Sequence, residues 1–191
     1  MIKVKTLLII LFLLVSSSII ANDISEFEIE GFSVGQSLLD YTNEKKIISK
    51  ISKQQYPNDI YIIYNADEIV NIEIYQYLSV TTKKNDKKYI ITNVSGHINY
   101  EDLDECLEMK NKIQKDIENL IEFDDVQETK FKSSRDKTGK SMIYGVQYYL
   151  KPYPSTESIN VNCYHFTKET GLQRNLKVSA NSHEYSQFLI N

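Results

Sequence analysis

The alternation of apolar and polar residues predicts that most of this chain forms β-strands. In several runs apolar residues recur at every second position, which is the period of a strand with one buried face. Connections rich in turn-forming residues separate the later runs and allow the chain to reverse between antiparallel neighbours. The expected strands are Ile60 to Tyr64, Ile69 to about Thr82, Lys88 to about Ser95, about Val126 to Ser133, Ser141 to Lys151, Ser158 to Thr167 and Leu172 to Ala180.

The longest expected strand, Ile69 to Thr82, has one mainly apolar face. Tyr75 and Tyr77 point to the face opposite the apolar residues, because successive side chains of a strand alternate in direction. The apolar residues that share the other parity are Ile72, Ile74, Leu78 and Val80.

A different period, with apolar residues three and four positions apart, predicts one long amphipathic helix from Asn99 to Phe123. Asn99 is expected to cap its amino end. The helix would be roughly 35 Å long, enough to lie across a whole sheet. Its apolar stripe consists of Leu103, Cys106, Leu107, Ile113, Ile117, Leu120 and Ile121.

Short helices are expected near both ends of the chain. One or two lie between Gln36 and about Ser52, and another follows Asn181, which has the spacing of a capping box with Glu184. The predicted fold class is therefore α+β. It is an antiparallel sheet of about six to seven strands with the long helix packed on one face, in a single domain spanning residues 22–191.

The first residues have the pattern of a secretory signal peptide. Basic Lys3 and Lys5 precede an apolar run from Leu7 to Val15, and the small residue Ala21 suits cleavage after position 21. The expected location of the mature protein is the periplasm or the extracellular space, with no stable membrane anchor. A retained membrane anchor is the alternative, although the apolar run is short for a bilayer.

Charge excludes one class of partner. The chain has 22 basic and 26 acidic residues, a formal net charge of −4, and removal of Lys3 and Lys5 would leave 20 against 26, or −6. An acidic protein is a poor binder of nucleic acid, whose backbone attracts basic surfaces. With 41% hydrophobic residues, the composition is that of a folded protein.

The two cysteines, Cys106 and Cys163, are expected to form a disulfide in an oxidising compartment. Cys163 alternates with polar residues on an apolar strand face, and Cys106 belongs to the apolar stripe of the helix. Both thiols therefore point to one helix–sheet interface. The alternative is a thiol nucleophile at Cys163 assisted by His165, which shares its strand face.

One segment carries two partial hydrolase signatures. GFSVG at 31–35 fits G-x-S-x-G and makes Ser33 a candidate nucleophile. GQSL at 35–38 differs by one residue from the G-D-S-L motif and makes Ser37 a second candidate, with His183 as its base. The parallel-sheet pattern that both motifs require is missing, so a small serine hydrolase is kept only as the alternative function.

The same segment supports a resemblance. Ile29 to Tyr41 reads IEGFSVGQSLLDY, and it is similar to the start of small exported bacterial proteins that carry Ile-Glu-Gly followed by Ser-x-Gly-x-Ser-Leu-Leu-Asp-Tyr. The region from Cys163 to Tyr185 has a similar character. The resemblance implies residence in the periplasm and no assigned activity.

Other chemistry is sparse. The three histidines are scattered without a metal-ligand spacing, so no metal and no cofactor are expected. The fourteen tyrosines suggest a binding surface, although a compositional bias explains them equally well. The tyrosines proposed for that surface are Tyr75, Tyr77, Tyr148, Tyr149 and Tyr164.

The sequence therefore predicts an exported, soluble, non-enzymatic protein. Its expected role is binding, or interaction with the cell envelope, through an unknown protein or small-molecule partner.

Overall fold

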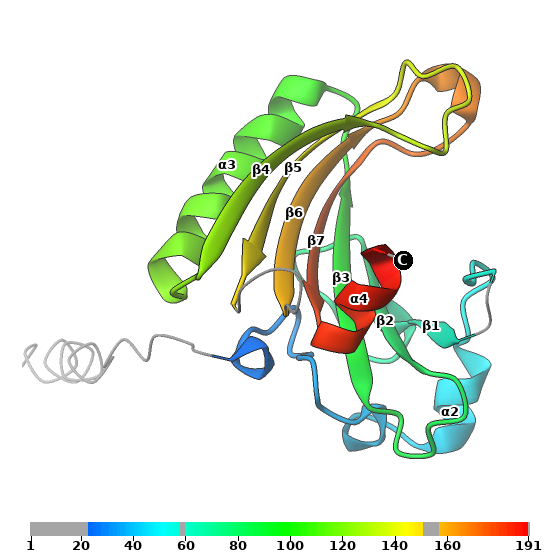
Figure 1. The fold of residues 1–191 in the computed structure, drawn as a ribbon. Coiled ribbons are helices and arrows are strands. Elements are labelled where there is room, and N and C mark those ends of the chain that lie inside the picture. Colours follow the sequence, from blue (N-terminus) through cyan, green and yellow to red (C-terminus); the bar gives the residue numbers. More distant parts are fainter. Residues whose placement is uncertain (1–22, 58–59, 151–156, 191) are drawn as a thin grey trace, which may run out of the picture.

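The computed structural model describes residues 23–57, 60–150 and 157–190, so the predicted signal peptide, residues 1–21, lies outside the described residues. The described chain contains a seven-stranded, wholly antiparallel sheet (Figure 1), as predicted. Its strands are β1 (Tyr61–Asn65), β2 (Tyr77–Lys83), β3 (Ile91–Asn99), β4 (Asp125–Lys132), β5 (Met142–Tyr149), β6 (Ser158–His165) and β7 (Asn175–Asn181).

The strand order is β1-β2-β3-β7-β6-β5-β4, which means that two meanders are joined edge to edge. The first meander is β1 to β3 and the second is β4 to β7. The two meet where β3 pairs with β7, in a register that aligns Gly96 with Val178 and His97 with Lys177. The connection from β3 to β4 must therefore cross the width of the second meander.

Helix α3 (Leu103–Leu120) makes this crossing and packs on one face of the sheet (Figure 1), as predicted. The predicted cap is wrong, because Asn99 is the last residue of β3 and pairs with Asn175. Asp102 caps the helix instead, its carboxylate accepting hydrogen bonds from the backbone N–H groups of Asp104 and Glu105. None of the helices in the described ranges has both the length and the apolarity needed to cross a bilayer.

The predicted disulfide between Cys106 and Cys163 is present, and its Cα atoms lie 6.0 Å apart. Both cysteines are buried between α3 and β6. Leu120 departs from the predicted apolar stripe, because it is exposed at the end of the helix. The α3 side of the sheet carries the apolar core, to which the second meander contributes Val146, Tyr148, Ile159, Val161, Leu176, Val178 and Ala180.

The amino-terminal segment covers the first meander on this same face. It contains the 3-10 helices η1 (Ile24–Glu26) and η2 (Leu38–Asp40) and the short helix α2 (Glu44–Ser49). Its apolar side chains join one continuous core with Leu78, Val80 and Val94 of the sheet. The buried residues that the segment contributes are Ile24, Ile29, Phe32, Val34, Leu38 and Ile47.

The predicted strand from Ile69 to Thr82 is only half correct. The short helix η3 (Ala66–Glu68) ends just before it, and strand pairing begins at Tyr77. The N–H groups of Glu73, Ile74 and Tyr75 bond instead to the carboxylate of Glu30. Ile74 is consequently 72% exposed and does not share a buried face with Leu78.

Helix α4 (His183–Ile190) lies on the face opposite α3 (Figure 1). Tyr185 of α4 packs edge-on against Tyr61, which points away from the core face. Asn181, the predicted cap of this helix, is instead the last residue of β7. Ser182 takes its place, because the Ser182 hydroxyl accepts a hydrogen bond from the Tyr185 N–H. The remaining 3-10 helix, η4 (Lys168–Thr170), lies between β6 and β7.

We expect the disulfide to supply much of the stability of the fold. A C106A/C163A variant should lose about 2–5 kcal/mol of unfolding free energy, because the denatured chain regains the freedom that the crosslink removes. Urea unfolding measures the loss. Wild-type protein reduced with dithiothreitol should unfold at nearly the same urea concentration as the variant, and the variant itself should not respond to reductant. An unchanged midpoint in the variant would contradict this assignment.

Candidate functional site

On its four central strands, the face of the sheet that points away from α3 carries mostly polar side chains, and we call it the polar face. Alternation places sixteen side chains of the four central strands on it, six of which are asparagines. The sheet register arranges them in cross-strand rows. These residues are Asn93, Ser95, His97 and Asn99 of β3, Asn175, Lys177, Ser179 and Asn181 of β7, Ser158, Asn160, Asn162 and Tyr164 of β6, and Ile143, Gly145, Gln147 and Tyr149 of β5.

One row of the polar face is buried beneath α4 and its hydrogen bonds are made internally. The Asn93 amide donates to Asn181 Oδ1 at 2.8 Å, and the Asn181 amide donates to the Ser158 hydroxyl at 3.1 Å. Ser158 in turn lies 3.2 Å from the hydroxyl of Ser186 in α4. This row fixes α4 to the sheet, because buried polar groups are costly unless they are paired.

The next two rows are only partly accessible to solvent, because their amide, imidazole and ammonium side chains are half-buried whereas Ser95 and Ser179 are buried. We call them the Ser179 row (Ser95, Ser179, Asn160 and Gln147) and the Lys177 row (His97, Lys177, Asn162 and Gly145). Within the described parts of the chain, four side chains of these rows have no hydrogen-bond partner. They are Ser179, Asn160, Gln147 and Lys177.

Those four side chains stand on strands and not on loops, so their positions are fixed by the sheet. Preorganised donors and acceptors of this kind can bind a ligand with little cost in ordering. An unpartnered amide or hydroxyl on a rigid surface must otherwise bond to water. These two rows are therefore the candidate site.

Two side chains of the Lys177 row, Lys177 and His97, have lowered pKa values. Burial, and then the charge of Arg135, lower the pKa of Lys177 to about 8. Burial, and then the charge of Lys177, lower the pKa of His97 to about 4, so His97 is neutral at physiological pH. Lys177 is thus the charged centre of the row, and Arg135, in the β4–β5 turn, is the second cation that acts on it.

Gly145 leaves space in the Lys177 row for the side chain of Asn162. A Cβ atom at Gly145 would overlap the amide oxygen of Asn162 on the neighbouring strand and crowd the Thr129 hydroxyl. The missing side chain therefore allows the Asn162 amide to lie across β5, beside Lys177.

The five tyrosines proposed as one binding surface do not form one. Tyr148 and Tyr149 are buried, and the Tyr148 hydroxyl donates to Glu118 Oε1 of α3 at 3.0 Å. Tyr75 lies over the core face, where its ring fills the space above Gly96. Tyr164 and the 55%-exposed Tyr77 do share the polar face, since Tyr77 pairs with His97.

The two serines of the hydrolase alternative lie in different surroundings. Ser33 is 1% exposed, and its hydroxyl is enclosed without a hydrogen-bond partner among the described residues. The Ser37 hydroxyl donates to the Lys88 carbonyl at 2.6 Å and caps η2 by accepting from the Leu39 N–H. His183 begins α4 on the polar-face side, whereas Ser33 lies with the amino-terminal segment on the core side.

The IEGFSVGQSLLDY segment is a folded cover for the core. Glu30 has a φ of 53° and Gly31 a φ of 79°, which together produce the sharp turn. The Tyr41 hydroxyl lies within hydrogen-bond distance of the Gly31 carbonyl and of the Gln36 amide oxygen, and the Tyr41 ring packs on Phe32. These contacts account for most of the motif without invoking chemistry.

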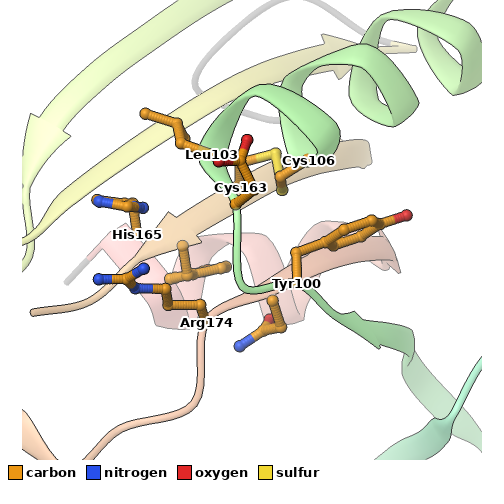
Figure 2. Close-up of a pocket in the computed structure, with 9 residues that line it drawn as sticks. Tyr100, Leu103, Cys106, Cys163, His165 and Arg174 are labelled. Atoms are coloured by element: carbon orange, nitrogen blue, oxygen red, sulfur yellow. A yellow bond between two sulfur atoms is a disulfide. The ribbon is translucent and has the colours of Figure 1, made fainter. Parts of the chain in front are cut away.

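A small hollow lies beside the disulfide (Figure 2), where Tyr100, Leu103, His165 and Arg174 surround the two cysteines. Its volume of about 10 Å³ leaves room for roughly one water molecule. Arg174 closes the hollow by donating to the carbonyls of Phe166 and Glu101, both at 2.8 Å. Cys163 is oxidised here, so it offers no thiolate for His165 to activate.

Within the described residues, no three acidic, histidine or cysteine side chains gather in a way that would hold a metal ion. The chain matches no protein-family model, and neither a curated protein nor a solved structure is significantly similar to it. The resemblance of Ile29 to Tyr41 to exported bacterial proteins therefore stays a prediction.

We expect Glu30 to hold the 73–75 segment through its charge. Burial acts to raise its pKa, but the hydrogen bonds from Ile74, Glu73 and Tyr75 outweigh burial and lower it below 4.5. The carboxylate therefore contributes stability above about pH 4.5, and this contribution is lost as the pH falls through the folded-state pKa. Glu30→Gln should cost roughly 1–3 kcal/mol at neutral pH, because a charged acceptor is lost.

Urea unfolding at neutral pH and at about pH 3 measures this contribution. The difference between wild type and E30Q should shrink at the lower pH. Glu28→Gln, which removes the same charge from an exposed neighbour, is the control. Equal midpoints for E30Q and E28Q at neutral pH would refute the role of Glu30.

Proposed function

We propose that this chain is an exported, non-enzymatic binding module that holds a hydrophilic ligand on the polar face of its sheet. One observation carries the proposal. Ser179, Asn160, Gln147 and Lys177 stand side by side on rigid strands, and none of their side chains is hydrogen-bonded within the described structure.

The chemistry of these groups favours a ligand rich in polar atoms. An amide side chain both donates and accepts hydrogen bonds, a hydroxyl does the same, and the ammonium only donates. A ligand with hydroxyl, carbonyl or acidic groups could satisfy all four residues. The acidic net charge of −4 argues against nucleic acid as that ligand.

Two features support an exported location. The Cys106–Cys163 disulfide suits an oxidising compartment, because thiols stay reduced in most cytosols. Met1 to Ala21 has the pattern of a signal peptide, although this segment lies outside the described residues. The proposed module therefore acts in the periplasm or the extracellular space.

We expect the exported chain to begin at Asn22. Intact-mass analysis of protein recovered from the periplasm or medium of its own cells measures the cleavage site. Ala21→Arg should block processing, because signal peptidase requires a small residue there, and should leave the chain in the membrane fraction. Wild-type protein found in the cytosol with residues 1–21 attached would rule out export.

We expect ligand binding to depend on the Ser179 row. Native mass spectrometry of the exported protein should detect a bound small molecule, whose affinity is then measured by calorimetry. An N160A/S179A variant should bind the molecule about tenfold more weakly, which is the effect of losing one or two hydrogen bonds. The same variant should unfold at an unchanged or higher temperature, because the two removed groups have no internal partner.

Asn111→Ala, on the exposed side of α3, is the matched control and should bind as wild type does. Unchanged affinity in N160A/S179A, or a protein that carries no ligand and binds no water-soluble component of its native envelope extract, would refute the proposed function.

A further inference from the structure

The central part of the polar face carries positive charge and no negative charge. None of its sixteen positions on β3, β5, β6 and β7 is an aspartate or a glutamate. This is unusual in a chain with 26 acidic and 22 basic residues.

Three carboxylates on elements around the polar face have partners of their own. Glu184 of α4 forms an ion pair with Lys83 at 2.6 Å. Asp136, in the β4–β5 turn, accepts hydrogen bonds from the backbone and hydroxyl groups of both Thr138 and Ser141. Asp125, at the far edge, accepts from Gln127.

Lys177 is therefore a half-buried ammonium without a counter-ion in the part of the chain that is described. Its neighbours in the row are the imidazole of His97 and the amide of Asn162, neither of which is anionic. A partly desolvated cation without an anion is unfavourable. An anion that enters from solvent would remove that cost.

Arg135 supplies a second cation directed at the same place. It projects from the β4–β5 turn, whose shape is fixed by the four hydrogen bonds to Asp136. The β4–β5 turn lies at the end of the sheet where Ile143 pairs with Tyr164, one row beyond the Lys177 row. From this turn the charge of Arg135 acts on both Lys177 and Tyr164. A guanidinium presents paired N–H donors that match two oxygens of one oxyanion.

We infer that the ligand carries an oxyanion group, such as a carboxylate, phosphate or sulfate, which binds between Lys177 and Arg135. This inference rests on the proposed function and names the class of ligand. In the complex, the Lys177 ammonium and the Arg135 guanidinium donate to the oxyanion, and the Asn162 amide donates from the floor. The Ser179 row then contacts the uncharged remainder of the ligand.

A small ligand fits this charge pattern better than a polyanion. Two cations on an otherwise neutral surface can balance one oxyanion, whereas a nucleic acid or an anionic membrane needs a broad basic patch. The net charge of the whole chain also repels such polyanions.

Lysine-selective ¹³C NMR of the mature protein tests the inference. The Lys177 signal is assigned by its absence in K177M, and its titration gives the pKa in chloride and in equal ionic strengths of sodium phosphate, sulfate and succinate. Oxyanion binding should raise the pKa of Lys177 from about 8 in a saturable manner, because a nearby negative charge favours the ammonium. The anion that raises the pKa of Lys177 identifies the kind of acidic group that the ligand carries.

Affinity for the ligand found by native mass spectrometry gives a second, independent readout. K177M and R135Q should each weaken binding about tenfold or more, as expected for a charged hydrogen bond. Lys112→Met, which removes an equal charge from the exposed side of α3, should not. R135Q changes only an exposed turn residue, so it keeps the test valid if K177M alters folding.

Two results would overturn the inference. One is a Lys177 pKa that none of the three oxyanions raises above its value in chloride. The other is a ligand that N160A/S179A binds about tenfold more weakly but that K177M and R135Q bind within about twofold of wild type, less than the change expected for one lost charged contact. In the second case the proposed function stands and only the anionic group is refuted.

Discussion

The register between β3 and β7 is the constraint on which the rest of the structure depends. It joins two meanders into one sheet and decides which side chains face α3. A slip by one residue would move Lys177 and Asn175 into the core and expose Leu176 and Val178, because strand side chains alternate between faces. The apolar core and the polar face therefore specify the same register from opposite sides of the sheet.

Helix α3 converts this register into a rigid support. The chain must pass from β3 to the far edge of the sheet at β4, and α3 makes that passage across the core face (Figure 1). The Cys106–Cys163 bond ties the helix to β6, whose other face carries Asn160 and Asn162. The disulfide thus restrains β6 from the core face, while the candidate site lies on the opposite face of the same strand.

The sequence predicts those features that depend on short-range periodicity. The seven-stranded sheet, the long helix and the disulfide follow from periods of two and 3.6 residues. The true start of the strand predicted at 69–82 could not be predicted, because Glu30 holds the backbone of residues 73–75 from more than forty positions away. In the sequence, the polar face could be recognised only as an alternation of polar and apolar residues within single strands. Recognising that Lys177 lies between His97 and Asn162 requires the order of the strands, which one sequence does not supply.

The polar face also has an energetic consequence for the fold. The side chains of Lys177, Asn160 and Gln147 make no hydrogen bonds within the described structure, so they add little to the stability of the free protein. A disulfide that contributes about 2–5 kcal/mol allows such a surface to remain unsatisfied while the protein stays folded. A ligand at 100 times its dissociation constant would add about 2.7 kcal/mol, because it binds only the folded state. Crosslink and ligand therefore stabilise the same sheet from opposite faces, the first permanently and the second only when the ligand is present.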